Sequence, residues 1–449
     1  MEKIKPRTLS GFMELLPTQQ VYFDAMAHRL REAFSIYGFT PLDTPLMEAV
    51  EVLLAKGGGE TEKQVYLLRK GDTDLALRYE LTTSLAKYVA MNYGRLTFPF
   101  KRYEIGKSYR GERAQRGRFR EFYQADIDII GDDKLDVLNE AEIPSVIYNS
   151  FKSLGLTRFT IRINNRKTLN GFFEIIGITE GASAVMRVVD KLDKLGRDKL
   201  SEILVDDLSL SKAQVSEILD FVTFDGDPFE IIDKYKGKNE AFDIGAQELW
   251  LVKKHIKGFG VPDANFKIDL SIARGLDYYT GTVYETYMTD HPEVGSVCSG
   301  GRYDNLAEYF TDKKLPGVGI SIGLTRLFFI LNEQGLLNAS MLSAPADVLI
   351  IPMTDDLSPA VALATSMRGA GLRVQVFGEV KKFKSKVAYA DKLGIPYVVF
   401  LGEDEISKGM ITVKDMSTGE QTTASAGLLT SGIAEKVKSL RNQAPIAEN

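Results

Sequence analysis

Residues 101–120 hold the densest group of side chains that could bind an anion. The segment contains eight basic residues and only two acidic ones, Glu104 and Glu112. Arginine's planar guanidinium can donate two parallel hydrogen bonds to phosphate oxygens, so the segment could hold a polyphosphate or an RNA backbone. The alternative is a solvated charged hairpin, since runs of charge are common on protein surfaces. Charge alone leaves both interpretations open.

A second group of candidate ligand-binding side chains lies in "SIARGLDYYTGTVYETY", residues 271–287. We predict a hairpin here, and side-by-side tyrosine and arginine could line a polar pocket. A strand with an exposed aromatic face is the alternative. The polar side chains of this group are Arg274, Asp277, Tyr278, Tyr279, Tyr284 and Tyr287.

Residues 317–327, "GVGISIGLTRL", are typical of a glycine-spaced strand that leads into a helix. Arg326 falls in the first turn of that helix, where the helix dipole favours an anion, so a phosphate ligand would explain it. A solvent-exposed arginine is the alternative. Upstream, Gly300-Gly301 predicts a tight turn that presents Tyr303.

Glu80 and Thr82, in "LRYELTT", are predicted on one strand face, where together they could bind an amine. Polar residues at a strand end are the alternative. The chain's three histidines are His28, His255 and His291, which we interpret as structural or surface residues. The sequence contains no Walker loop, zinc motif or Ser-His-Asp pattern.

These residues require several elements to position them. We expect a helix over 17–37, a hairpin around Gly71-Asp72, a helix over 81–94, and strands over 100–110 and 119–131 flanking the arginine-rich loop. Residues 180–256 predict a helical insertion. Beyond Ala344-Pro345, alternating strands and helices predict a separate α/β domain with a mostly parallel sheet.

The composition fits a multidomain globular protein of 449 residues, with 44% hydrophobic and 26% charged residues and a formal charge of -5. Cys298 is the only cysteine, which excludes an intrachain disulfide framework. The first residues show no apolar signal-peptide core, and no apolar run is long enough to cross a membrane. We therefore expect a cytoplasmic protein without a membrane segment.

In this order, the segments resemble the histidyl-tRNA synthetases over nearly the whole chain. Residues 109–131 resemble motif 2 of class II synthetases, residues 317–327 resemble motif 3, and residues 37–53 resemble motif 1 with Pro45 as its proline. The segments "ARGLDYY" and "CSGGRYD" resemble two short signatures of the histidyl family. The resemblance implies a mixed α/β (α+β) fold in two domains. Residues 1–335 would form an antiparallel-sheet catalytic domain with a helical insertion at about 175–257, and residues 345–449 an anticodon-binding domain.

The resemblance also implies roles for individual residues in ATP binding. Arg110 would hold the α-phosphate, Arg326 the γ-phosphate, and Phe122 would stack on the adenine. Glu112 would meet the adenine amino group, and Arg118 would lie near the nucleotide. Mg²⁺ would accompany the departing pyrophosphate.

For L-histidine, the resemblance places Arg274 beside the substrate carboxylate and the α-phosphate. The α-amino group would be bound by Glu80, Thr82 and Gln124. Asp128 and Tyr279 would bind the imidazole nitrogens, with Tyr303 nearby. Many bacterial relatives have glutamate in place of Asp128 and proline in place of Tyr79, so the reach to the imidazole is expected to differ here.

The implied reaction joins histidine and ATP to histidyl-adenylate and pyrophosphate, then transfers histidine to the 3′ end of tRNA(His). A homodimer is implied by motif 1. The alternative is a catalytically inactive, histidine-binding regulatory paralogue. Such proteins generally lack the anticodon domain and lose motif residues, whereas residues 346–449, Arg110, Arg274 and Arg326 are present here.

Overall fold

The computed structural model describes residues 3–55, 60–273, 278–338, 343–443 and 446–447. The chain forms two compact units, one containing residues 1–13 and 26–336 and the other residues 14–25 and 337–448. The proposed domain limits of 1–335 and 345–449 remain a prediction. Helix α1 (Pro17–Ile36) matches the helix predicted over 17–37. None of the helices in the described ranges is long and apolar enough to cross a membrane.

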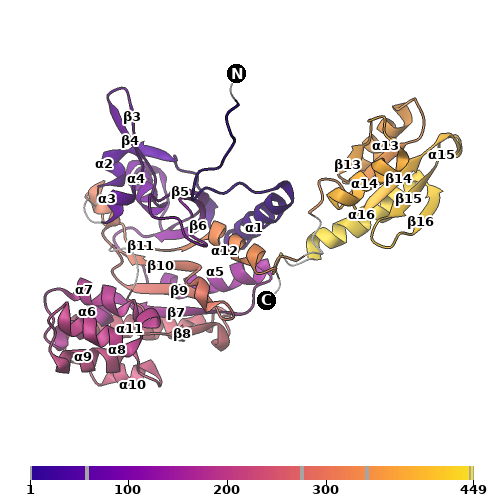
Figure 1. Cartoon of the computed structure of the whole chain (residues 1–449). Coiled ribbons are helices and arrows are strands. Elements are labelled where there is room, and N and C mark those ends of the chain that lie inside the picture. The colour runs from indigo at the N-terminus through magenta and orange to yellow at the C-terminus, as the bar shows by residue number, and fades with distance from the viewer. Residues whose placement is uncertain (1–2, 56–59, 274–277, 339–342, 444–445, 448–449) are drawn as a thin grey trace. The chain divides into compact units, whose positions relative to one another are not determined.

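The first unit is built on an eight-stranded sheet (Figure 1). Its neighbouring strands are antiparallel except at the two edges, where β1 pairs with β5 and β8 with β7 in parallel. In spatial order, the strands are β1 (Thr40–Pro41), β5 (Phe100–Tyr109), β6 (Glu121–Ile130), β11 (Gly317–Ile322), β10 (Cys298–Tyr303), β9 (Thr282–Met288), β7 (Phe159–Asn165) and β8 (Phe266–Ile268). This confirms the predicted antiparallel-rich fold.

Alternation of side chains along the strands divides the sheet into an apolar face and a polar face. Ala125, Ile127 and Ile129 of β6 are fully buried on the apolar face. Tyr284 of β9 donates to the Glu140 carbonyl of α5 (Leu138–Leu154) at 2.7 Å, so α5 covers that face. The neighbouring Glu285 consequently points to the polar face, which carries the candidate site.

Smaller elements frame the polar face. Strands β2 (Met47–Ala49), β4 (Thr73–Leu77) and β3 (Leu67–Lys70) form a separate antiparallel sheet, and the predicted hairpin at Gly71-Asp72 is its β3–β4 turn. The helices nearby are α2 (Val50–Leu53), α3 (Glu60–Gln64), α4 (Thr82–Asn92) and α12 (Leu324–Glu333).

The predicted insertion is helical. Its helices are α6 (Arg166–Ile175), α7 (Ala182–Val189), α8 (Leu192–Asp206), α9 (Lys212–Val222), α10 (Pro228–Asp233) and α11 (Glu240–Ile256). Phe172 and Phe221 stack at its centre with ring centroids 4.0 Å apart. Glycines let α6 and α11 approach closely, because a Cβ at Gly245 would lie 2.4 Å from the Thr168 amide nitrogen.

The second unit contains a five-stranded sheet in the order β13-β12-β14-β15-β16. Strands β13, β12 and β14 are parallel, as predicted, whereas β15 and β16 extend the sheet as an antiparallel hairpin. Its elements are β12 (Val348–Pro352), α13 (Ser358–Gly369), β13 (Val374–Val376), α14 (Phe383–Leu393), β14 (Tyr397–Leu401), α15 (Glu403–Lys408), β15 (Met410–Asp415), β16 (Gln421–Ser425) and α16 (Ala426–Gln443). Apolar clusters on both sheet faces make this unit an α/β layer structure.

Candidate active site

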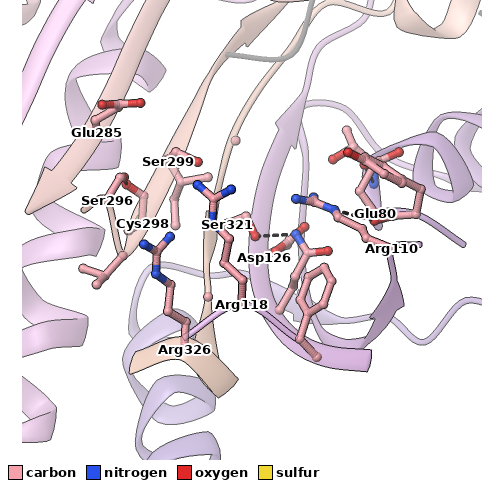
Figure 2. A pocket seen from close by; sticks show the side chains of 18 of the residues that line it. Glu80, Arg110, Arg118, Asp126, Glu285, Ser296, Cys298, Ser299, Ser321 and Arg326 are labelled. Carbon is pink, nitrogen blue, oxygen red and sulfur yellow. Dashed lines mark hydrogen bonds between the residues drawn. The ribbon is translucent and has the colours of Figure 1, made fainter. Parts of the chain in front are cut away.

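A cavity of about 430 Å³ opens on the polar face of the large sheet (Figure 2). Every described residue to which the family resemblance assigns a role lines it, whereas Tyr284 and Tyr287 do not, and Arg274 and Asp277 lie outside the described residues. The lining residues from that prediction are Glu80, Thr82, Arg110, Glu112, Arg118, Phe122, Gln124, Asp128, Tyr279, Tyr303 and Arg326. Segments more than 200 residues apart in sequence therefore converge on one site.

Arg110 lies at the end of the cavity predicted to bind the nucleotide. Strands β5 and β6 pair from Phe100↔Ile130 to Tyr109↔Glu121, and the next backbone hydrogen bond joins Arg110 N to Arg120 O at 2.9 Å. The Arg110 guanidinium carbon lies 4.4 Å from the ring centroid of Tyr79 and 5.1 Å from that of Phe122. Two aromatic rings therefore orient this cation at the cavity wall.

The other predicted nucleotide-binding residues also line the cavity. Glu112 and Arg118, both in the loop between β5 and β6, form a long ion pair of 3.8 Å with partly exposed side chains. Arg326 stands in the first turn of α12, as predicted, and donates to the Val294 carbonyl. A polyanion entering here would meet three guanidinium groups, which favours phosphate over an uncharged ligand.

Glu80 and Thr82 line the cavity, but the predicted strand through them is wrong. Strand β4 ends at Leu77, and Thr82 is the first residue of α4. The Glu80 carboxylate accepts hydrogen bonds from the backbone N–H groups of Thr82 and Thr83, the latter at 2.8 Å. A carboxylate is favoured at a helix N-terminus, so this capping interaction fixes Glu80 at the cavity wall.

Gln124 and Asp128 rise from the polar face of β6. Gln124 donates through Nε2 to Ser321 Oγ at 2.7 Å, while the Tyr303 hydroxyl donates to Asp128 Oδ1 at 2.6 Å. Gly319 leaves space for Asp128, because a Cβ at this position would lie 2.1 Å from Asp128 Oδ1. The glycine spacing of β11 is thus a packing requirement of the site.

A series of buried ion pairs connects Asp128 to Arg102, Glu104 and Arg78. Arg102 Nη2 lies 2.7 Å from Asp128 Oδ2, and Arg102 Nη1 lies 3.7 Å from Glu104 Oε2. Arg78 Nη1 pairs with Glu104 Oε1 at 2.8 Å, and the backbone N–H of Thr44 donates to the same oxygen at 3.0 Å. Burial raises the pKa of Asp128 to about 6, although Arg102 and the Tyr303 hydroxyl act to lower it.

The tyrosines of the second sequence group lie in different places. Tyr279 and Tyr278 line the cavity, with ring centroids 5.0 Å apart, and burial raises the pKa of Tyr278 well above its usual range. The predicted hairpin is wrong for the described residues, because β9 pairs with β7 and β10. The predicted turn at Gly300-Gly301 is also wrong: both glycines lie within β10, where a Cβ on Gly300 would lie 2.1 Å from the Gly319 carbonyl oxygen.

Sequence reasoning missed several lining residues. Asp126 and Ser321 are among them. Asp126 could have been found, because residues 122, 124, 126 and 128 share one face of a strand. Ser321 could not, since its place opposite Asp126 depends on the β6–β11 register.

Comparisons with known proteins agree with this geometry. Residues 11–327 match the family model described as Histidyl-tRNA synthetase, and residues 347–436 match one described as Anticodon binding domain. The histidine–tRNA ligase of Clostridium tetani is 50% identical over 442 residues, which cover 98% of this chain and 99% of the relative. That of Finegoldia magna is 46% identical and covers 93% of this chain and 97% of the relative.

A solved structure shares the whole fold. The crystal structure of histidyl-tRNA synthetase from Nostoc sp. PCC 7120 is 39% identical in sequence and superposes with a TM-score of 0.88, covering 97% of this chain and 99% of that one. The family match spans more than half of the chain, and the relatives match it almost from end to end. The chain therefore belongs to the histidyl-tRNA synthetase family of class II aminoacyl-tRNA synthetases.

Proposed function

We propose that this chain is a histidine–tRNA ligase that uses the cavity on the large sheet for both steps of its reaction. The observation that supports this most is the convergence of two chemistries in one cavity. Guanidinium groups suited to phosphates line the cavity together with buried carboxyl and hydroxyl groups suited to an amino acid. An enzyme that joins an amino acid to a nucleotide needs both in contact.

At the nucleotide end, Arg110 would bind the α-phosphate and stabilise the negative charge that develops there in the transition state. Phe122 would stack on the adenine, with Glu112 accepting from its amino group. Arg326 would bind the γ-phosphate, and Arg118 would lie beside the nucleotide. Tyr79 and Phe122 hold Arg110 in place before ATP arrives, which reduces the reorganisation that catalysis requires.

At the amino-acid end, Glu80, Thr82 and Gln124 would bind the α-amino group of histidine. Glu80 is already held by backbone N–H groups, so its carboxylate presents a fixed charge to the ammonium. Asp128 and Tyr279 would bind the imidazole, with Tyr303 holding Asp128 in position. An analogue that lacks the ring nitrogens would leave buried polar groups unpaired, and the site would reject it strongly.

In the first step, the histidine carboxylate would attack the α-phosphorus of ATP and expel pyrophosphate, with Arg274 beside the carboxylate. In the second, the terminal ribose hydroxyl of tRNA(His) would attack the carbonyl carbon of the adenylate and release AMP. The described residues contain no cluster of three or more His, Cys, Asp or Glu side chains that could hold a metal. Mg²⁺ would therefore bind mainly to phosphate oxygens and water, as it commonly does.

A homodimer is part of the proposal, because motif 1 contributes the dimer interface in class II enzymes. Near Pro45, the large apolar side chains of Leu46 and Met47 are 42% and 43% exposed, and Leu67 of the same small sheet is 62% exposed. Exposed apolar side chains gathered in one small sheet favour a protein partner.

ATP–pyrophosphate exchange measured with each of the twenty amino acids tests the function directly. We expect exchange with histidine alone, and we expect Arg274→Ala to abolish it. Exchange with a different amino acid would retain the class II chemistry and refute the assignment of Asp128 and Tyr279. Histidine binding without any exchange would instead favour a regulatory protein.

The second unit is proposed to bind the anticodon through a lysine patch, which we define as Lys381, Lys382 and Lys384. These lysines are exposed at the start of α14, beside Phe383, which is 48% exposed. Cations that contact phosphates, next to an aromatic ring that can stack on a base, suit single-stranded RNA.

Changing all three patch lysines to alanine is expected to raise the KM for tRNA(His) by roughly tenfold or more at moderate salt. Histidine-dependent pyrophosphate exchange should be unchanged, because that step does not involve tRNA. The matched control replaces Lys408, Lys436 and Lys438, three exposed lysines of the same unit, and removes the same total charge. An equal rise in KM for both triple variants would show that only net charge matters.

A further inference from the structure

Asp126 is the most informative residue that the family resemblance does not assign. It lies between Gln124 and Asp128 on the cavity face of β6 and is 3% exposed. Figure 2 shows its side chain at the cavity beside Ser321, with Arg118 on one side and Arg110 and Glu80 on the other. A buried carboxyl group in this place needs a partner, because an ionised group loses its hydration when it is enclosed.

The neighbouring carboxyl group, Asp128, is already engaged on both oxygens. Its Oδ1 accepts from the Tyr303 hydroxyl at 2.6 Å. Its Oδ2 lies 2.7 Å from Arg102 Nη2, in an ion pair whose angles fall short of a well-aligned hydrogen bond. Asp128 therefore has a cation of its own, and its Oδ2 keeps the capacity to accept a hydrogen bond from a ligand.

Asp126 differs, because its Oδ1 is buried and accepts no hydrogen bond from the part of the chain that the structure describes. Among the described residues, the polar partner of its carboxyl group is the Ser321 hydroxyl. Ser321 also accepts from Gln124 at 2.7 Å, so the Ser321 hydroxyl holds Asp126 at the wall of the cavity.

The described arginines near Asp126 are paired with other carboxyl groups. Arg78 pairs with Glu104, Arg102 pairs with Asp128, and Glu80 is capped by backbone N–H groups. Burial raises the pKa of Asp126 well above its usual range, opposed by Arg102 and Ser321. The titratable and charged groups that act on Asp126, or on which it acts, are Glu80, Arg102, Asp128, Tyr279 and Cys298. An N–H group of a ligand would compensate the buried Asp126 carboxyl group by donating a hydrogen bond to it. A positively charged N–H group would stabilise the carboxylate most.

We propose that Asp126 is a specificity-determining residue whose Oδ1 accepts a hydrogen bond from a ring N–H of the histidine substrate, alongside Asp128. This inference rests on the proposed function. Two carboxyl groups facing one five-membered ring would favour its protonated form, which offers two N–H donors. It would also explain how a site with a short carboxylate at position 128 reaches the ring.

The test uses the full-length protein with Asp126→Asn and Asp126→Ala, assayed by histidine-dependent pyrophosphate exchange. We expect the KM for histidine to rise roughly 10- to 100-fold in Asp126→Ala, the range for loss of a hydrogen bond to a charged group. The rise should be smaller in Asp126→Asn, whose amide oxygen can still accept a hydrogen bond but carries no charge. The KM for ATP should change by less than about twofold, because losing even one neutral hydrogen bond to ATP would change it by more than that. Glu121→Gln is the matched control, because Glu121 lies on the same strand, faces away from the cavity and pairs with Lys107 at 2.9 Å.

A second readout separates ring recognition from a merely structural role. Each enzyme is compared on histidine and on β-(2-thienyl)alanine, whose five-membered ring has no N–H group. The ratio of kcat/KM for histidine to kcat/KM for β-(2-thienyl)alanine should fall by a similar factor in the Asp126 variants. A distorted pocket would instead lower kcat/KM for both amino acids equally. Equal loss for both substrates, or an unchanged KM for histidine, would overturn the inference and leave the proposed function intact. Failure of the unmodified enzyme to exchange with histidine would instead remove the proposed function itself.

If Asp126→Ala does not fold, Asp126→Asn decides the question, because it retains the shape of the side chain. Thermal unfolding of each variant shows whether it is folded.

Discussion

Arg110→Ala is expected to lower the rate of histidine-dependent pyrophosphate exchange by roughly 10²- to 10³-fold, the usual cost of removing one donor to a developing charge. The guanidinium group is held between Tyr79 and Phe122 at the cavity wall, so the donor is positioned before the substrates bind. The loss should fall mainly on kcat, because the charge that Arg110 would stabilise grows in the transition state.

Arg116→Ala is the matched control for this experiment. Arg116 lies in the same loop, is 66% exposed, and pairs with Glu333 at 2.9 Å outside the cavity. An exposed ion pair of this kind contributes little, so exchange should change by less than about twofold. Similar losses in both variants would indicate that the loop as a whole, rather than Arg110, supports catalysis.

Arg102→Leu is expected to lower the free energy of unfolding of the first unit by about 3–5 kcal/mol at pH 8, because it leaves buried carboxylates without a partner. Arg102 is fully buried and lies 2.7 Å from Asp128 and 3.7 Å from Glu104. Trp250 is the chain's only tryptophan and stands in α11 of this unit, so its fluorescence during urea unfolding reports the change.

The deficit caused by Arg102→Leu should shrink as the pH falls. Arg102 lowers the pKa of Asp128, which burial nevertheless holds at about 6. Removing the cation would raise that pKa further. A carboxyl group with a raised folded pKa stabilises the fold at low pH and loses that contribution as the pH rises through its folded value. We therefore expect a smaller difference from the unmodified chain near pH 5 than near pH 8.

Arg158→Leu provides the comparison for the same measurement. Arg158 is 60% exposed and pairs with Asp290 at 2.6 Å, so its loss should cost at most about 1 kcal/mol. A pH-independent deficit in Arg102→Leu, or a deficit no larger than that of Arg158→Leu, would show that the buried pair does not stabilise Asp128.

Local sequence patterns predicted most of the elements. The β5–β6 hairpin was predictable because its residues alternate between apolar and polar faces, and the arginine-rich loop lies directly between the strands. Helix α1 and the first three strands of the second unit follow from the same kind of short-range periodicity. Hydrophobic periodicity acts within a few residues, so one sequence is enough to detect it.

The same local patterns were misleading where backbone conformation depends on distant contacts. Glu80 and Thr82 line the cavity, but they were predicted on a strand, because period-two spacing cannot distinguish a strand end from a helix cap. Gly300 and Gly301 were predicted as a turn, although they are the close-approach residues of a strand packed against β11. Glycine is common both in turns and at strand positions where another backbone approaches closely. Only the position of the neighbouring strand shows which of the two occurs.

The sequence by itself determined the family, part of the set of residues that line the cavity, and the order of the elements. Only the tertiary structure decided how the carboxyl groups at the amino-acid end are paired. Arg78, Arg102 and Glu104 are charged residues that a sequence places at the surface by default. Their partners come from segments up to tens of residues away and meet them only when β5, β6 and the segment around Thr44 pack together. That pairing engages Asp128, whereas Oδ1 of Asp126 accepts no hydrogen bond from the described residues. A buried charge is tolerated only where another group compensates it.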